Sequence, residues 1–187
     1  TAKKERMTQM DTYRLQVAGL ERDLPVCPLG NGVSIAGFVM FSDVELTIAC
    51  ATELLKKLPE HDVLLTAESK GIPLAYEMSR QSGKRYILAR KSKKLYMKNA
   101  VEVDVQSITT AGLQKLYLSG EDMEYLKGKR VLLVDDVIST GESLRALEKL
   151  TEKAGGIVAG KAAVLAEGDA SKRDDIIFLA PLPLIHE

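Results

Sequence analysis

The sequence predicts an α/β fold with a mainly parallel sheet and helices on both faces. Short apolar runs typical of buried strands alternate along the chain with amphipathic segments typical of helices. The run from Val131 to Ser143 has the clearest pattern: four apolar residues, two acids and a small-residue turn that opens a helix. A chain of 187 residues can bury a full core but would crowd two domains. We therefore expect one domain over residues 1–187.

The N-terminal part predicts a flap in front of a core. Residues 1–20 mix charged and apolar positions, which is compatible with a helix or with an arm lying on the domain. Residues 21–41 carry prolines and glycines among apolar residues, which indicates short strands and turns. The capping box Ser-Asp-Val-Glu at residues 42–45 starts a helix that Pro59 ends.

The next unit is a buried strand over residues 63–67, a polar loop, and a helix over residues 72–81 that tolerates Pro73 in its first turn. The loop consists of Glu68, Ser69, Lys70 and Gly71. Its small residues and the start of the helix offer amide donors, and the lysine adds positive charge where a diphosphate can sit. By itself this loop is a weak signal, which a plain strand-to-helix turn explains better.

A strand over residues 85–89 is followed by an abrupt concentration of positive charge. Five cations occupy nine positions: Arg90, Lys91, Lys93, Lys94 and Lys98. Two alternating segments follow, residues 101–109 and 113–118, and they are joined across Ala111-Gly112, which predicts a long hairpin. A charge run of this kind is usually a solvated face.

The turn that follows the strand at residues 131–134 has the chemistry of an anion site. It contains Ser139, Thr140, Gly141, Glu142 and Ser143. Small side chains, a glycine that allows a left-handed backbone and the amides of a beginning helix together favour a phosphate. It is not a Walker loop, because no lysine occurs between Val131 and Arg145. Asp135 and Asp136 would repel a bare phosphate, yet they can accept hydrogen bonds from sugar hydroxyls or bind magnesium carried by a phosphorylated ligand. The predicted ligand therefore carries both phosphate and ribose.

The C-terminal part adds a strand over residues 157–165, a polar loop over residues 167–174 and a strand over residues 176–180. The ending Pro181-Leu182-Pro183-Leu184 lacks two ladder donors, so it cannot continue a central strand. We expect it to cap the site or the sheet edge.

Composition argues against several classes of function. The 26 basic and 26 acidic residues give zero formal net charge, so nothing points to nucleic acid or to an anionic membrane surface. No apolar run approaches the ~18 residues of a membrane helix, and the first residues lack an apolar signal core, so we expect a cytoplasmic protein. Cys27, Cys50, His61 and His186 have no metal or redox spacing and are interpreted as structural or surface residues.

The thirteen residues from Val131 to Ser143 resemble the signature of type I phosphoribosyltransferases that binds phosphoribosyl pyrophosphate (PRPP). The resemblance implies that Asp135 and Asp136 hold the ribose 2- and 3-hydroxyls, and that the loop from Ser139 to Ser143 holds the 5-phosphate. Glu142 stands where the family frequently has glycine. We expect its carboxylate to face solvent while only its amide serves the site.

The same resemblance gives the other loops a role. The loop at residues 68–71 is similar to the family's pyrophosphate loop, and Arg90, Lys91 and Lys94 stand where basic residues close over pyrophosphate. Lys94 is also a candidate catalytic residue. The Ala-Arg-Lys opening and the segment at residues 106–109 are most similar to xanthine-type enzymes. No Gly-Glu pair occurs between Arg90 and Leu118, so the catalytic glutamate of adenine-type enzymes cannot be transferred to this chain.

The resemblance implies a purine phosphoribosyltransferase of nucleotide salvage, a pentosyl-transferring glycosyltransferase with adenine as first choice and xanthine or guanine next. It also implies a mobile β-hairpin, a homodimer, and Mg²⁺ carried by PRPP near Asp135 and Asp136, with no other metal site assigned. Residues 1–41 would form an arm and hood, and residues 42–187 the core. Base recognition is expected within residues 24–41, although a covering segment without ligand contact explains them equally well.

Two other functions stay open at this point. Some regulators keep this fold and signature as non-catalytic PRPP sensors, and orotate is an alternative acceptor. The sensors usually couple the fold to a DNA-binding module, for which 187 near-neutral residues leave little room. The sequence does not identify the base, the hood residues that contact it, or the order of binding.

Overall fold

The computed structural model describes residues 11–106 and 113–186. The expectations for residues 1–10, for the segment Ser107–Thr109 and for the hairpin turn at Ala111-Gly112 lie outside the described residues. No helix in the described part of the chain is long and apolar enough to cross a membrane.

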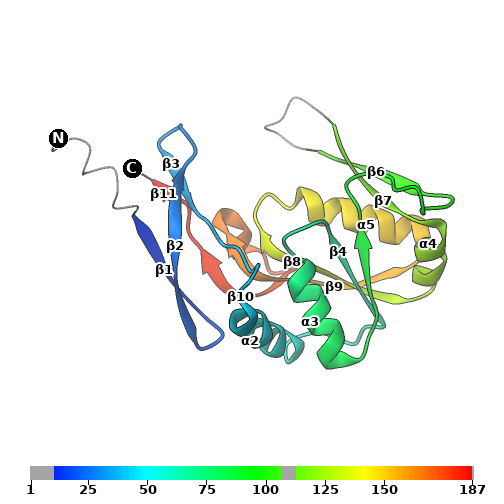
Figure 1. The fold of residues 1–187 in the computed structure, drawn as a ribbon, viewed down its shortest axis with the longest axis horizontal. Helices are drawn as coiled ribbons and strands as arrows, with labels where there is room; N and C mark the ends of the chain where they lie inside the picture. The colour runs from blue at the N-terminus through cyan, green and yellow to red at the C-terminus, as the bar shows by residue number, and fades with distance from the viewer. Residues whose placement is uncertain (1–10, 107–112, 187) are drawn as a thin grey trace.

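The centre of the molecule is a five-stranded sheet in the order β10-β9-β8-β4-β5, in which every pair of neighbours is parallel (Figure 1). Its strands are β4 (Val63–Ala67), β5 (Tyr86–Ala89), β8 (Arg130–Ile138), β9 (Ile157–Glu167) and β10 (Ile177–Leu182). Five of five residues in β4 are buried, as expected for a strand covered on both faces. The predicted α/β fold with a mainly parallel sheet is confirmed.

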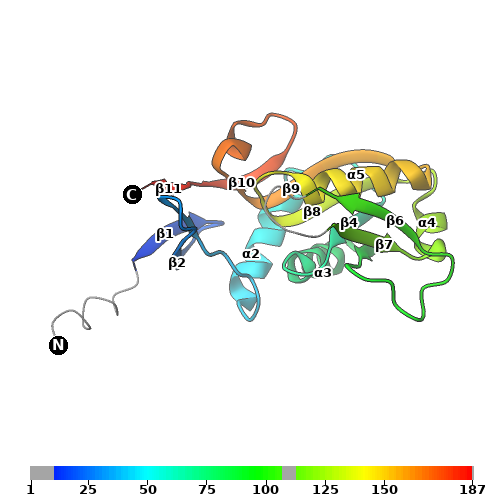
Figure 2. The ribbon, with the colours of Figure 1, turned by 90° about the horizontal axis from the view of Figure 1, so that it is seen from above.

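Helices cover both faces of the sheet (Figure 2). They are α2 (Val44–Leu55), α3 (Ile72–Ser82), α4 (Gly120–Leu126) and α5 (Glu142–Ala154), with a short 3₁₀ helix η1 (Gly168–Lys172) after β9. Leu64 and Leu132 pack in the apolar cluster that contains α2 and α3, whereas Leu65 and Leu133 pack in the cluster that contains α4 and α5. Neighbouring residues of one strand therefore supply two separate cores, because successive side chains point to opposite faces.

The predicted hairpin is present as β6 (Val101–Val105) and β7 (Gln114–Leu118), which pair antiparallel. A bridge between Arg90 and Tyr117 connects β7 to the end of β5. The hairpin therefore begins beside the basic run, as the sequence predicted.

A second, antiparallel sheet forms the hood, in the order β1-β2-β3-β11. Its strands are β1 (Thr12–Val17), β2 (Leu20–Pro28), β3 (Val33–Ala36) and β11 (Ile185–His186). The described part of the first 20 residues is strand, so a helix there was wrong. The last strand comes from the other end of the chain, which the sequence did not indicate (Figure 1). β10 includes Pro181, which is tolerated because β10 is an edge strand.

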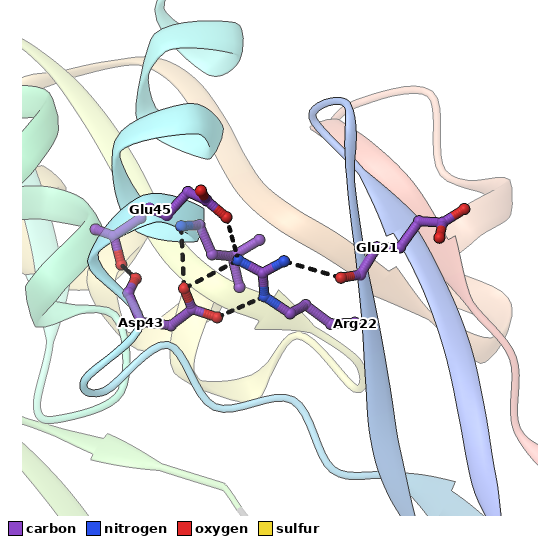
Figure 3. Close-up of polar contacts among 6 residues, drawn as sticks. Glu21, Arg22, Asp43 and Glu45 are labelled. Carbon is purple, nitrogen blue, oxygen red and sulfur yellow. Dashed lines mark hydrogen bonds and ion pairs between the residues drawn. The ribbon is translucent and has the colours of Figure 1, made fainter.

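One ion-pair cluster connects the hood to the core (Figure 3). Asp43, not Ser42, is the N-cap of α2, and its Oδ1 accepts a hydrogen bond from the Leu46 amide at 3.1 Å. Arg22 of β2 donates through Nε to Asp43 Oδ2 at 2.8 Å and through Nη2 to Glu45 at 2.9 Å. The Arg22 guanidinium is the main reason that the pKa of Asp43 lies below its usual range. One carboxylate thus serves both the helix and the hood.

We expect Asp43→Ala to destabilise the protein by about 1 kcal/mol or more, because the N-cap of α2 is lost together with the ion pair between Arg22 of the hood and the core. The folded-state pKa of Asp43 is lowered, so its contribution is present above the unfolded pKa of about 4 and is lost as pH falls below it. Urea unfolding at pH 7 and at low pH measures both effects. Ser42→Ala is the control and should change stability by less than about 0.5 kcal/mol. If Ser42→Ala destabilised the protein as much as Asp43→Ala, Ser42 would be the N-cap instead.

Candidate active site

The paired acids lie within β8, close to its carboxyl end. Asp136 is only 5% exposed, and its Oδ2 has no hydrogen-bond partner in the structure. Its amide donates to Asp135 Oδ1 at 2.8 Å. Burial, and next the neighbouring Asp136, raise the pKa of Asp135 well above its usual range, while Lys70 opposes this shift. Two adjacent carboxylates in a shielded place, one of which has an oxygen without a partner, favour a ligand that brings hydroxyl donors or positive charge.

The turn after β8 has the geometry of an anion loop. Gly141 has φ of 80°, and α5 begins at the next residue without a side-chain cap. A cavity of about 290 Å³ is lined by the whole turn and by Val105, Gln106 and Gln114, where β6 ends and β7 begins. The amides at the start of α5 therefore face a space in which an anion can be held.

The position of Glu142 differs from the expectation that its carboxylate faces solvent. Its side chain lines the cavity wall and is 20% exposed, so it does not simply face solvent. The carboxylate accepts a hydrogen bond from Arg145 Nη1 at 3.0 Å. The guanidinium one helical turn later offsets the negative charge, which explains how an acid is accommodated beside an anion loop.

The second loop follows β4, and it touches the acid pair. Its Glu68–Ser69 peptide bond is cis, and α3 begins at Ile72 with Pro73 in its first turn, as predicted. A methyl group at Gly71 would lie 2.8 Å from Thr66 Oγ1 and 3.4 Å from Asp135 Oδ1. β4 and β8 are paired neighbours, so their carboxyl ends bring the two loops together.

One cleft of about 350 Å³ joins these parts. Its polar wall includes Glu68, Ser69, Lys70, Lys91, Asp135, Asp136, Ser139 and Ser143. Residues 35–38, at the end of β3 and directly after it, also line the cleft, so of the expected recognition segment 24–41 only this part reaches it. Gln114 and Glu167 line the cleft too and were missed, whereas Leu182 belongs to the segment 181–184 that was expected to cap the site or the sheet edge. Glu167 was detectable in principle, because it is an acid at the carboxyl end of a strand.

Of the three predicted basic residues after β5, which are Arg90, Lys91 and Lys94, only Lys91 lines the cleft, to which the other loop contributes Lys70. Glu68 accepts hydrogen bonds from the Lys91 amide at 2.8 Å and from Arg90 Nε at 3.0 Å. These contacts, the Lys91 amide first, lower the pKa of Glu68. The Lys94 ammonium donates to Ser92 Oγ at 2.7 Å. Glu68 and Arg90 thus connect the two loops, while Lys91 is the residue of the basic run that lines the cleft together with Lys70.

The remaining candidates agree with a structural role. Cys50 and His61 are buried, and Cys27 is exposed without a disulfide partner. In the described ranges, 11–106 and 113–186, no three His, Cys, Asp or Glu side chains are grouped as a metal site. The carboxylates of Asp135 and Asp136 are the donor pair in the cleft that suits a hard cation carried by a ligand.

A parallel sheet with two anion loops and an acid pair at its carboxyl edge defines an α/β protein of the class that binds phosphorylated sugars. More specifically, this chain belongs to the phosphoribosyltransferase family. Residues 41–180 match the family profile described as the phosphoribosyl transferase domain. The resemblance, and with it the assignment as a glycosyltransferase enzyme, is confirmed.

Proteins similar to this chain in sequence or in structure are also phosphoribosyltransferases. The hypoxanthine/guanine phosphoribosyltransferase of Methanocella paludicola is 32% identical over 145 residues, which are 78% of this chain and 70% of the relative. That of Ferroglobus placidus is 38% identical over 112 residues, 60% of this chain and 56% of the relative. Among solved structures, the adenine phosphoribosyltransferase of Thermoanaerobacter pseudethanolicus superposes with a TM-score of 0.68 at 21% identity, covering 84% of this chain and 95% of that chain. The match in structure supports the fold alone, because the identity is low.

Proposed function

We propose that this purine phosphoribosyltransferase transfers the 5-phosphoribosyl group from PRPP to a 6-oxopurine, hypoxanthine or guanine, and releases pyrophosphate. The curated relatives at 32% identity carry hypoxanthine/guanine names, which supports this choice of base. The adenine enzymes resemble the chain in fold at 21% identity or less, so adenine as first choice is not confirmed. The observation that carries the proposal is the single cleft in which an acid pair faces two anion loops.

Each part of the cleft has a proposed role. Asp135 and Asp136 accept hydrogen bonds from the ribose hydroxyls, because their oxygens are acceptors and one of them lacks a partner. The turn over residues 139–143 holds the 5-phosphate at the start of α5. The loop over residues 68–71, together with Lys91, holds the pyrophosphate. The ribose carbon that reacts would then lie between the two anion loops, with the base on the hood side.

This arrangement suits a transition state with positive charge on the ribose ring and growing negative charge on the leaving diphosphate. The fixed carboxylates hold and stabilise the ring, and Lys70 and Lys91 offset the charge of the leaving group. The hood and the hairpin border the cleft and limit the access of water.

Magnesium fits this site as a companion of PRPP. The orphaned Asp136 Oδ2 and the adjacent Asp135 are oxygen donors, and two carboxylates leave room for the phosphate oxygens of the ligand. When bound, the ion would neutralise charge on the diphosphate. The residues of the chain would then orient the ribose relative to the base.

Purified protein should form a nucleoside monophosphate and pyrophosphate from magnesium, PRPP and a 6-oxopurine. Adenine, guanine, hypoxanthine, xanthine and orotate should be compared at equal concentration, with product identified by chromatography. PRPP binding without pyrophosphate release from any base would overturn the proposed activity and favour a sensor. Release with orotate alone would overturn the choice of a purine.

Lys91→Ala should lower turnover by about ten- to a hundredfold at saturating PRPP, because a cation beside the leaving group contributes most in the transition state. Lys94→Ala is the matched control and should have the smaller effect, because its ammonium contacts Ser92 and does not line the cleft. Steady-state kinetics of both variants measures the difference. A larger loss in Lys94→Ala would assign the catalytic role to Lys94, as the sequence suggested.

We also propose a homodimer. Four exposed apolar side chains on α2, α3 and the segment before α2 surround a groove that Ser69 also lines: Phe41, Val44, Ile48 and Tyr76. A second copy covering this patch would reach the pyrophosphate loop, which makes the groove continuous with the cleft.

Val44→Glu should convert the dimer to a monomer, because it places a charge in the apolar patch of a two-fold interface. Light scattering measures the mass, and Ile157→Lys is the control at an apolar side chain of similar exposure elsewhere. A monomeric wild-type protein at working concentration would contradict the proposal.

A further inference from the structure

Glu167 lies at the carboxyl edge of the sheet as the last residue of β9. On one side β9 pairs with β8, and on the other β10 places Leu182 opposite Glu167. Leu165 packs in the apolar cluster on the hood side, whereas Ala166 packs in the opposite cluster. Because side chains alternate along a strand, Glu167 is placed on the hood side of the sheet. Glu167 therefore lies at the hood end of the central cleft, which it lines.

Apolar residues of the hood-side cluster line the cleft together with Glu167. Phe38 and Leu182 are 3% and 1% exposed, and Val137 is half-buried. Glu167 is itself half-buried, and within the described residues no hydrogen bond or ion pair engages its carboxylate. This carboxylate is therefore available as an acceptor beside an apolar wall, where a ligand that offers N–H donors can bind it.

The shape of the cleft leaves this end for the base. The acid pair and the two loops account for ribose, phosphate and pyrophosphate, and the apolar walls of Phe38, Val137 and Leu182 suit the faces of a flat ring. We infer that Glu167 recognises the purine by accepting hydrogen bonds from adjacent N–H groups on its pyrimidine edge, so that guanine is the preferred base. This inference rests on the proposed function.

The chemistry of a carboxylate separates the purines clearly. An ionised carboxylate is only an acceptor, and its two oxygens match two neighbouring donors. Guanine presents N1–H beside its 2-amino group and satisfies both oxygens. Hypoxanthine presents N1–H alone. Adenine presents its amino group beside the acceptor N1, whose lone pair would face a carboxylate oxygen.

The test compares the specificity of wild type and Glu167→Gln for guanine, hypoxanthine and adenine. In the wild type, guanine should have the highest kcat/KM. Glu167→Gln replaces one acceptor by a donor, so kcat/KM for guanine should fall about ten- to a hundredfold and the guanine/hypoxanthine ratio should collapse. PRPP affinity, measured by calorimetry, should stay within about twofold, because the variant leaves the PRPP residues unchanged.

Asp169→Asn is the matched control, since it removes the same charge two residues away from a side chain that is 97% exposed. It should leave the base ratio unchanged. A wild-type test needs no variant: 1-methylguanine, which lacks the N1–H donor, should be a much poorer substrate than guanine. If the enzyme prefers hypoxanthine to guanine, accepts 1-methylguanine, or keeps its base ratio in Glu167→Gln, the inference fails while the proposed function stands. If it prefers adenine to both 6-oxopurines, the inference and the proposed choice of base both fail. If no base reacts, the proposed function fails.

Discussion

The double variant Asp135→Asn/Asp136→Asn should bind PRPP about a hundred- to ten-thousandfold more weakly than the wild type. Two charged acceptors for ribose hydroxyls are lost, and each hydrogen bond to a charged group contributes about 1.5 to 3 kcal/mol. Titration calorimetry with magnesium and PRPP measures the loss. Asp169→Asn/Asp174→Asn removes the same number of charges at exposed positions and should leave the affinity unchanged.

The same double variant should not be less stable than the wild type at pH 7. The pKa of Asp135 is raised in the folded protein, so its ionisation opposes folding, and its unfavourable effect grows as pH rises above the unfolded pKa of about 4. The stability of the variant relative to wild type should therefore increase from pH 4 to pH 7 in urea unfolding. A variant that keeps its fold and binds PRPP normally would refute the proposed ribose site.

Gly71→Ala should lower kcat/KM by about a hundredfold or more. The added methyl group would meet Thr66 Oγ1 at 2.8 Å and Asp135 Oδ1 at 3.4 Å, so the loop or the acid must move. Misplacement of a positioning group by about 1 Å can cost roughly a hundredfold in rate. Initial rates over a range of PRPP concentrations measure the loss.

Gly83→Ala separates this effect from a general loss of stability. Gly83 ends α3 with φ of 72° and has nothing within 4 Å of an added methyl group. Alanine there should cost about 1 kcal/mol of stability through backbone strain, with turnover unchanged. Equal turnover in Gly71→Ala and wild type would show that the close approach of the two loops has no part in catalysis.

The sequence predicted the parts of the candidate site that are formed by residues adjacent in the sequence. The run from Val131 to Ser143 combines a buried strand, an acid pair and a helix start, and each of these has its own local signal. The proximity of the loop at residues 68–71 also followed, because the carboxyl ends of parallel strands meet at one edge.

The features that were missed depend on contacts between distant segments. Whether Lys91 or Lys94 reaches the cleft depends on how Glu68 holds the basic loop, and residue type alone does not specify that. Similarly, Asp43 rather than Ser42 caps α2 while also pairing with Arg22, which is 21 residues away. The pairing of β11 with β3 joins segments about 150 residues apart in the sequence, and a two-residue strand has no periodic signal.

That pairing restricts how the hood can move. The hood is joined to the core by two stretches of chain, one from β3 to α2 and one from β10 to β11 (Figure 1). With two attachments, a swing about the line that joins them is the hood motion that displaces neither, and the Arg22–Asp43 ion pair and the buried side chains that the hood shares with the core oppose it. Phe38 belongs to the first stretch, and Leu182 immediately precedes the second. Such a swing would change the spacing of these two walls while the acid pair and both anion loops stay in place on the sheet.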